Sequence, residues 1–132
     1  MIGLDTNVLV RYVVRDDARQ TAAATRLMES SCTPDSPGIV PLVVLCEVVW
    51  VLDRGYRYSR SDIATVLRAI LSAADLQVER SPLAWQALNG YEDGRADFAD
   101  YVIALTAAGE SAETTYTFDR TAAGYRLFRL LT

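Results

Sequence analysis

The residues that could do chemistry in this sequence are its carboxylates. The 132-residue chain has no histidine, and all 13 of its basic residues are arginines, so lysine is absent too. This composition excludes a histidine general base, histidine-ligated zinc, Schiff-base catalysis and a phosphate-loop lysine. An enzyme built from this sequence therefore depends on Asp and Glu. Because isolated carboxylates are poor acids at neutral pH, such an enzyme is expected to use a cation that prefers oxygen ligands.

Two of the acids stand where apolar, strand-like segments end. Asp5 follows Ile2-Gly3-Leu4, and Asp119 follows Thr117-Phe118. The carboxyl ends of parallel strands meet at one edge of a sheet, where ligands of α/β proteins bind. An Asp between a strand and a helix is also a common helix cap, so each of these two positions is open to either interpretation.

Glu47 lies in the apolar segment from Pro41 to Leu52. At helical spacing its neighbours three and four residues away are all apolar. A carboxylate on such a face seldom lacks a partner or a metal, because an unpaired buried charge costs several kcal/mol. We therefore expect Glu47 to serve a site, with a half-exposed position on a helix edge as the alternative.

A further pair of acids, Asp97 and Asp100, lies three residues apart at a predicted helix start. This spacing is typical of a capping arrangement. Capping and site functions are compatible here, since Asp97 can cap the helix while Asp100, one turn in, points to the same crevice as the other acids.

Converging carboxylates repel one another and raise one another's pKa unless a cation lies among them. Oxygen ligands select magnesium or manganese over zinc or copper. The reaction that most naturally uses such a centre is hydrolysis of a phosphate ester by an activated water molecule. The acids that we expect to converge are Asp5, Glu47, Asp100 and Asp119.

The elements that position these acids alternate between strand-like and helix-like segments. Strands are predicted at residues 2–5, 38–40, 76–79 and 114–118, with a short fifth at 126–131. Helix starts are predicted at Asp17, Ser59, Ser81 and Asp97, and helix ends at Gly55 and Gly109. This alternation predicts parallel strands with crossover helices.

Length and composition bound the class of protein. An apolar fraction of 51% supplies a core for one domain, which we expect to span residues 1–132. The two cysteines, Cys32 and Cys46, fit no disulfide or metal-binding spacing, which indicates a reducing compartment. No targeting signal or membrane-spanning stretch is evident, so a cytoplasmic location without membrane association is expected. The net charge of −4 does not itself favour nucleic acid, although a local basic face remains compatible with it.

Four segments of the chain together resemble the PIN-domain ribonucleases, and among them the VapC-like toxins of bacterial toxin–antitoxin pairs. These segments are Ile2-Gly3-Leu4-Asp5-Thr6-Asn7-Val8-Leu9-Val10, the Pro41 to Leu52 stretch, Ala96 to Ala104, and Tyr116-Thr117-Phe118-Asp119-Arg120. They occur in the order and at the spacing of the family. Each motif alone is short, but four in order across one small domain are specific.

The resemblance implies a three-layer α/β/α sandwich with a central parallel sheet of four or five strands, and a Mg²⁺- or Mn²⁺-dependent endoribonuclease. The family's acidic quartet carries over to Asp5, Glu47, Asp100 and Asp119, with Asp97 as a further metal ligand. Asn7 and Thr117 match polar residues that orient these carboxylates. Tyr101 departs from the family, where many relatives have a small residue, and we expect it to narrow the cleft.

The implied substrate is single-stranded or looped RNA, because its phosphodiesters and unpaired bases are accessible to a cleft. Candidate phosphate contacts are Arg11, Arg15, Arg54 and Arg57, with solvated helix faces and salt bridges to Asp16, Asp17 or Asp53 as the equally plausible alternative. The resemblance also implies a VapB-like antitoxin partner and a homodimer.

One alternative stays open. The chain could be a catalytically inactive PIN-like binding module whose acids are helix caps. Phosphoaspartate enzymes of the haloacid-dehalogenase and receiver types are excluded, because both need a lysine, and the former also needs an acid where Asn7 stands.

Overall fold

The N-terminal segment takes part in parallel strand pairing. The computed structural model describes residues 1–132. The chain divides into a first unit, Met1–Ser81, and a second unit, Pro82–Thr132. In the first unit, Gly3 forms a parallel bridge with Ile39, and β1 (Gly38–Val40) pairs in parallel with β2 (Leu76–Val78). The predicted first strand is thus a short extended segment that is bonded to Ile39. Leu4 N donates a hydrogen bond to Ile39 O, and Ile39 N donates one to Ile2 O.

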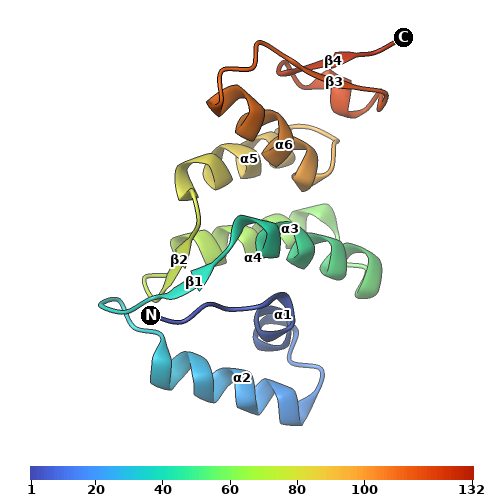
Figure 1. The fold of residues 1–132 in the computed structure, drawn as a ribbon. Coiled ribbons are helices and arrows are strands. Elements are labelled where there is room, and N and C mark those ends of the chain that lie inside the picture. Colours follow the sequence, from blue (N-terminus) through green and yellow to red (C-terminus); the bar gives the residue numbers. More distant parts are fainter. The chain divides into compact units, whose positions relative to one another are not determined.

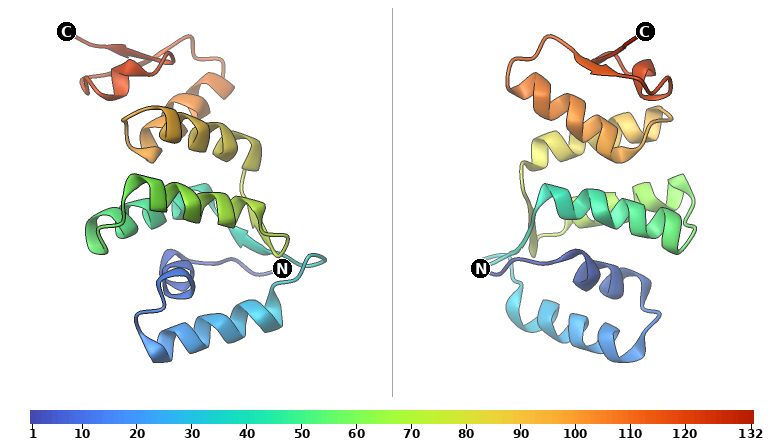
Figure 2. Two further views of the ribbon diagram at one scale, coloured as in Figure 1. Left: turned by 180° about the vertical axis from the view of Figure 1, so that it is seen from behind. Right: turned by 45° about the vertical axis from the view of Figure 1, so that its right-hand side comes forward.

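Helices connect these strands in the first unit. α1 (Thr6–Val14) and α2 (Ala18–Ser31) lead from the N-terminal segment to β1, and they lie next to each other (Figures 1 and 2). α3 (Leu42–Trp50), a π-helical turn η1 (Val51–Gly55) and α4 (Arg60–Ser72) lead from β1 to β2. Each crossover joins parallel neighbours, which is the arrangement predicted from the alternation of apolar segments.

The helix boundaries follow the capping signals. Asp17 accepts a hydrogen bond from Gln20 N at 2.9 Å, and Ser59 accepts one from Asp62 N at 3.0 Å. These side chains satisfy amide groups that the first turn of a helix leaves free. The predicted starts at Asp17 and Ser59 and the predicted stop at Gly55 are confirmed.

The core of the first unit forms where α1 packs against α3. Leu9 and Val10 of α1 are buried, as are Leu45 and Val48 of α3. A fully buried Leu or Val side chain stabilises a fold by about 1.5–3 kcal/mol relative to exposure. This packing fixes α1 and α3 relative to each other, and with them the acids that they carry.

In the second unit, α5 (Ser81–Asp93) and α6 (Phe98–Gly109) precede a parallel pair of strands, β3 (Thr115–Thr117) and β4 (Phe128–Leu130). A single 3₁₀ turn, η2 (Ala122–Gly124), lies between the strands. The predicted strands at 114–118 and 126–131 are confirmed, as is the helix end at Gly109. The protein therefore has an α/β fold with parallel strands in both units.

Tyr101 of α6 is accommodated by glycines of the second unit. A Cβ atom on Gly90 of α5 would lie 2.6 Å from Cδ1 of Tyr101, and one on Gly94 would collide with its hydroxyl oxygen. Tyr101 is buried, and its Oη accepts a hydrogen bond from Ala96 N at 3.3 Å. Gly90 and Gly94, which have no side chains, thus leave the space that the ring of Tyr101 occupies.

None of the helices has both the length and the apolar composition that crossing a bilayer requires. Cys32 and Cys46 are buried free thiols. Burial raises the pKa of the Cys46 thiol to about 11, so this group is a protonated, unreactive part of the core at neutral pH.

Candidate active site

Asp5 is the N-cap residue of α1, at the point where the N-terminal extended segment ends. Its Oδ1 accepts a hydrogen bond from Thr6 N at 2.7 Å. The side chain is exposed, and within the first unit its Oδ2 accepts no hydrogen bond. One carboxylate oxygen therefore fixes the group, and the other is available to a ligand.

Glu47 lies one turn and a half into α3, on an exposed position between buried neighbours. Its Oε1 accepts a hydrogen bond from the Thr6 hydroxyl at 2.9 Å. Because Thr6 also donates its backbone N–H to Asp5, this one buried residue orients both acids of the first unit. Sequence reasoning missed Thr6, although it is the residue that directly follows the first acid of the motif.

A further acid at this edge, Glu79, comes directly after β2. Its Oε1 accepts a hydrogen bond from Leu42 N at 2.8 Å. Leu42 begins α3 after Pro41, which has no side chain able to cap the helix. Glu79 thus caps the helix that carries Glu47, a role that only the β1–β2 pairing could reveal, since 37 positions separate the two residues.

In the second unit, Asp97 is the N-cap residue of α6, as predicted. Asp100 Oδ2 accepts a hydrogen bond from Asp97 N at 3.2 Å. Asp119 follows β3, and its Oδ1 accepts hydrogen bonds from Thr121 N at 2.8 Å and Ala122 N at 3.2 Å. Backbone amides therefore orient the carboxylates of Asp100 and Asp119.

The three acids of the second unit interact electrostatically. The pKa of Asp100 is raised, first because partial burial penalises its charged form and then because the charges of Asp97 and Asp119 oppose it. The hydrogen bond with the backbone of Asp97 offsets part of this effect. The second unit thus gathers like charges around Asp100, an environment that would be relieved by a cation.

The structure brings the predicted acids together in two groups, Asp5 with Glu47 and Asp97 with Asp100 and Asp119. The first group belongs to the first unit and the second group to the second unit. Neither unit alone brings three acidic or thiol side chains close enough to hold a metal ion. Within each unit, the five acids form no salt bridge.

The two polar residues predicted to support the acids differ in their contacts. Thr117 Oγ1 accepts a hydrogen bond from Asp119 N at 3.0 Å, which fixes the turn that presents the Asp119 carboxylate. Asn7 is exposed on α1 and lines a cavity of about 400 Å³ between α1 and α2. Thr117 is thus in direct contact with an acid of the site, whereas Asn7 faces a neighbouring cavity.

The predicted arginines all lie in the first unit, where three of them have partners. Arg11 forms a salt bridge with Asp16 at 3.1 Å and also donates a hydrogen bond to the Tyr56 hydroxyl at 2.7 Å. Tyr56 in turn donates to Asp16 at 2.8 Å, and this hydrogen bond is the main reason that the pKa of Asp16 is lowered. Arg11 is therefore part of a local network that joins the end of α1 to the residue after η1.

The other arginines lie on exposed turns. Arg15 ends α1 with φ 60° and lies 5.4 Å from the centre of the Tyr12 ring, and Arg54 lies 5.9 Å from that of Trp50. Arg57 is exposed and has φ 55°. Positive φ values are costly for residues other than glycine, so Arg15 and Arg57 occupy positions where glycine would fold more easily.

Comparison with known proteins identifies the family. The family model described as PIN domain matches residues 2–126. The chain is 26% identical over 117 residues to a protein named VapC ribonuclease from Aquifex aeolicus (strain VF5). The matched region covers 89% of this chain and 86% of that protein. It is also similar to the crystal structure of a VapC toxin from Mycobacterium tuberculosis, with 22% identity, 96% of each chain covered and a TM-score of 0.47. Because the family model spans nearly the whole chain, this protein belongs to the PIN domain family.

Proposed function

We propose that this protein is a metal-dependent endoribonuclease, the toxin of a toxin–antitoxin pair, that hydrolyses phosphodiester bonds of RNA. Membership of the PIN domain family and similarity to a VapC ribonuclease support this function. The observation that carries the proposal is the gathering of Asp97, Asp100 and Asp119 in the second unit, where backbone amides orient the Asp100 and Asp119 carboxylates. Partial burial and the neighbouring charges raise the pKa of Asp100, which accords with this grouping.

The donor set fits magnesium or manganese. Each proposed ligand offers only oxygen, the donor type that these hard cations prefer. In Asp5, Asp100 and Asp119, one carboxylate oxygen accepts a hydrogen bond from backbone N–H and the other accepts none within the same unit. Such groups are oriented before a ligand arrives and keep a lone pair for it. We propose that the cation is held by Asp5, Glu47, Asp100 and Asp119, with Asp97 as a further ligand.

When bound, a divalent cation would lower the pKa of a water molecule and stabilise the charge that develops on the leaving oxygen. The residues of the chain would orient the reacting groups. Thr6 keeps the Asp5 and Glu47 carboxylates in place through its amide and hydroxyl, and Thr117 holds the turn of Asp119.

Arginines would bind the RNA backbone. Arg15, Arg54 and Arg57 are exposed and form no salt bridge in the first unit, so their guanidinium groups are available to phosphate oxygens. Arg11 is shared with Asp16 and Tyr56, and a phosphate would have to compete with these partners. We further propose a VapB-like antitoxin as protein partner, and a homodimer as the oligomeric state.

The decisive experiment is an RNA cleavage assay. Purified protein is incubated with structured RNA and Mg²⁺ or Mn²⁺, beside Asp100→Asn and a matched control, Asp62→Asn, which changes an exposed acid of α4 outside the proposed set. We expect cleavage by the wild-type protein and by Asp62→Asn, and at least a 100-fold loss in Asp100→Asn, the order of effect of removing one group that stabilises transition-state charge. Cleavage that survives chelation or the Asp100 change would refute the mechanism.

A second function is favoured by a specific observation. Asp5, Asp97 and Asp119 all lie at the start of a helix or turn, and Asp5 and Asp119 accept hydrogen bonds from amides there. They could therefore be caps of a PIN-like binding module without catalytic activity. Absence of cleavage together with absence of any metal-dependent change in melting temperature would favour this alternative.

A further inference from the structure

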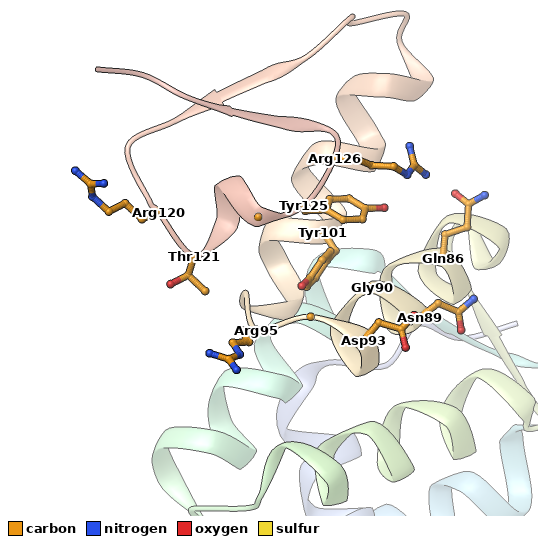
Figure 3. A pocket seen from close by; sticks show the side chains of 12 residues that line it. Gln86, Asn89, Gly90, Asp93, Arg95, Tyr101, Arg120, Thr121, Tyr125 and Arg126 are labelled. Carbon is orange, nitrogen blue, oxygen red and sulfur yellow. The ribbon is translucent and has the colours of Figure 1, made fainter.

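The second unit contains a cavity of about 770 Å³ that the proposed acidic site does not use. Its walls are formed by α5, by Tyr101 of α6 and by the segment from Arg120 to Arg126, which includes η2 (Figure 3). This volume lies within the range of about 300–1,000 Å³ that is typical of small-molecule sites. The cavity is thus large enough for a ligand of nucleotide size.

Arginines dominate the charge of the cavity, although the whole chain carries a net charge of −4. Arg95, Arg120 and Arg126 line it, opposed by one acid, Asp93. None of these arginines forms a salt bridge within the second unit. Figure 3 shows Arg126 at one end of the cavity near Gln86, and Arg95 and Arg120 toward the other end. Guanidinium groups without a carboxylate partner are suited to phosphate oxygens, which they can bind through two parallel hydrogen bonds.

An aromatic pair lies between the arginines. The rings of Tyr101 and Tyr125 pack edge to face, with centres 4.8 Å apart at 76°, and the Arg126 guanidinium lies 5.6 Å from the centre of Tyr125. Tyr101 is immobilised by close packing against Gly90 and by the hydrogen bond from Ala96 N. Tyr101 itself is buried and holds the half-buried Tyr125 in place, so Tyr125 is the ring of this pair on which an unpaired base can stack beside a cationic group.

Two amide side chains complete the wall. Gln86 and Asn89 are exposed on α5, three residues apart, and both line the cavity (Figure 3). An amide offers both donors and an acceptor, as the edges of nucleobases do. These groups distinguish the cavity from a simple anion site, which needs cations alone.

The cavity borders the acids of the second unit. Arg120 and Thr121 directly follow Asp119, and Thr121 N donates a hydrogen bond to Asp119 Oδ1 at 2.8 Å. Tyr101 directly follows Asp100 on α6. A ligand in the cavity would therefore lie beside the acids rather than among them.

We propose that this cavity binds one unpaired nucleotide of the RNA substrate, next to the phosphodiester that is cleaved. The base stacks on Tyr125 and is contacted by Gln86 and Asn89, while Arg126 binds its phosphate. The identity of the ligand as part of an RNA rests on the proposed ribonuclease function.

The test measures binding apart from cleavage. Ribonucleoside 5′-monophosphates, inorganic phosphate and a glutamate hexapeptide are titrated by calorimetry into the whole protein with a chelator present. The variants are Arg126→Gln and Asn89→Leu, with Arg129→Gln as the matched control, because Arg129 is an exposed arginine of β4 outside the cavity. We expect nucleotides to bind the wild-type protein at least tenfold more tightly than phosphate does. Their affinity should be about tenfold lower for Arg126→Gln and for Asn89→Leu than for the wild-type protein, and unchanged for Arg129→Gln.

Other results would overturn the inference. Equal affinity for phosphate and nucleotides would show an anion site without base contacts, and preference for the hexapeptide would indicate a protein partner. The cleavage assay separates the two proposals. RNA cleavage by Arg126→Gln at the wild-type rate with subsaturating RNA would overturn the nucleotide cavity and leave the ribonuclease function intact. Binding of nucleotides by a protein that cleaves no RNA would instead support the cavity and contradict the ribonuclease function.

Discussion

The hydroxyl of Thr6 donates a hydrogen bond to Oε1 of Glu47 at 2.9 Å, although 41 positions separate the two residues. The same threonine donates its backbone N–H to Asp5. Two acids that are far apart in the chain are therefore oriented by one buried residue, through its backbone N–H and its hydroxyl, and the contact between α1 and α3 brings Glu47 to it.

A double-mutant cycle tests this relationship. Thr6→Val keeps the shape of the side chain but removes the donor, and Glu47→Ala removes the acceptor. We expect a coupling energy of about 1 kcal/mol in the free energy of unfolding, because a hydrogen bond to an exposed charged group is near the lower end of its usual contribution. Urea denaturation of the two single variants and the double variant measures it, and additive effects would contradict the role given to Thr6.

The cap that Glu79 provides to α3 can be removed separately. Glu79→Ala leaves Leu42 N without its acceptor and should lower the free energy of unfolding by about 1 kcal/mol, the usual cost of losing an N-cap. Glu79→Gln keeps an acceptor oxygen at the same distance along the side chain and should lose less than half as much. Equal losses in the two variants, measured by urea denaturation, would show that charge rather than capping is responsible.

The raised pKa of Asp100 predicts how its removal depends on pH. Folding disfavours the charged form of this carboxylate. The resulting loss in the free energy of unfolding is absent below the ordinary pKa of 3.8 and grows as the pH rises through the higher pKa of the folded state. Asp100→Asn, which still offers an oxygen to Asp97 N, should therefore raise the melting temperature at pH 7 without metal and leave it unchanged near pH 3.5. A stabilisation of the same size at both pH values would rule out the electrostatic cause.

Metal binding predicts a stabilisation by mass action. With Mn²⁺ at about 100 times its Kd, the folded state should gain about 2.7 kcal/mol. Differential scanning fluorimetry should show a rise in melting temperature that Asp119→Asn reduces strongly. The control variant Asp62→Asn should respond as the wild-type protein does, and an unresponsive melting curve in wild-type protein would contradict the proposed metal ligands.

The close approach of α5 and α6 predicts the cost of a single methyl group. In Gly90→Ala the new Cβ would lie 2.6 Å from a ring carbon of the buried Tyr101. Overpacking of this kind costs about 1–3 kcal/mol, which exceeds the roughly 1 kcal/mol that alanine gains over glycine inside a helix. Thermal unfolding should show a lower melting temperature for Gly90→Ala, and introducing Gly90→Ala into a Tyr101→Leu background should remove this loss.

Much of the architecture could be predicted from local patterns. The starts of α2 and α4 at Asp17 and Ser59 follow from side chains that cap helices, and the ends of η1 and α6 at Gly55 and Gly109 follow from glycine. The parallel strands follow from short apolar segments separated by helices. These signals act over a few residues, so the linear sequence contains them.

The sequence by itself thus determined which side chains could do chemistry, because a chain without histidine and lysine has only carboxylates to hold a cation. Tertiary structure decided how those carboxylates are held. The bond from Thr6 to Glu47, the cap that Glu79 gives to α3 and the glycines that make room for Tyr101 join residues that pack together across different elements. Contacts of this kind depend on helix packing and strand register, and no pattern of neighbouring residues encodes them.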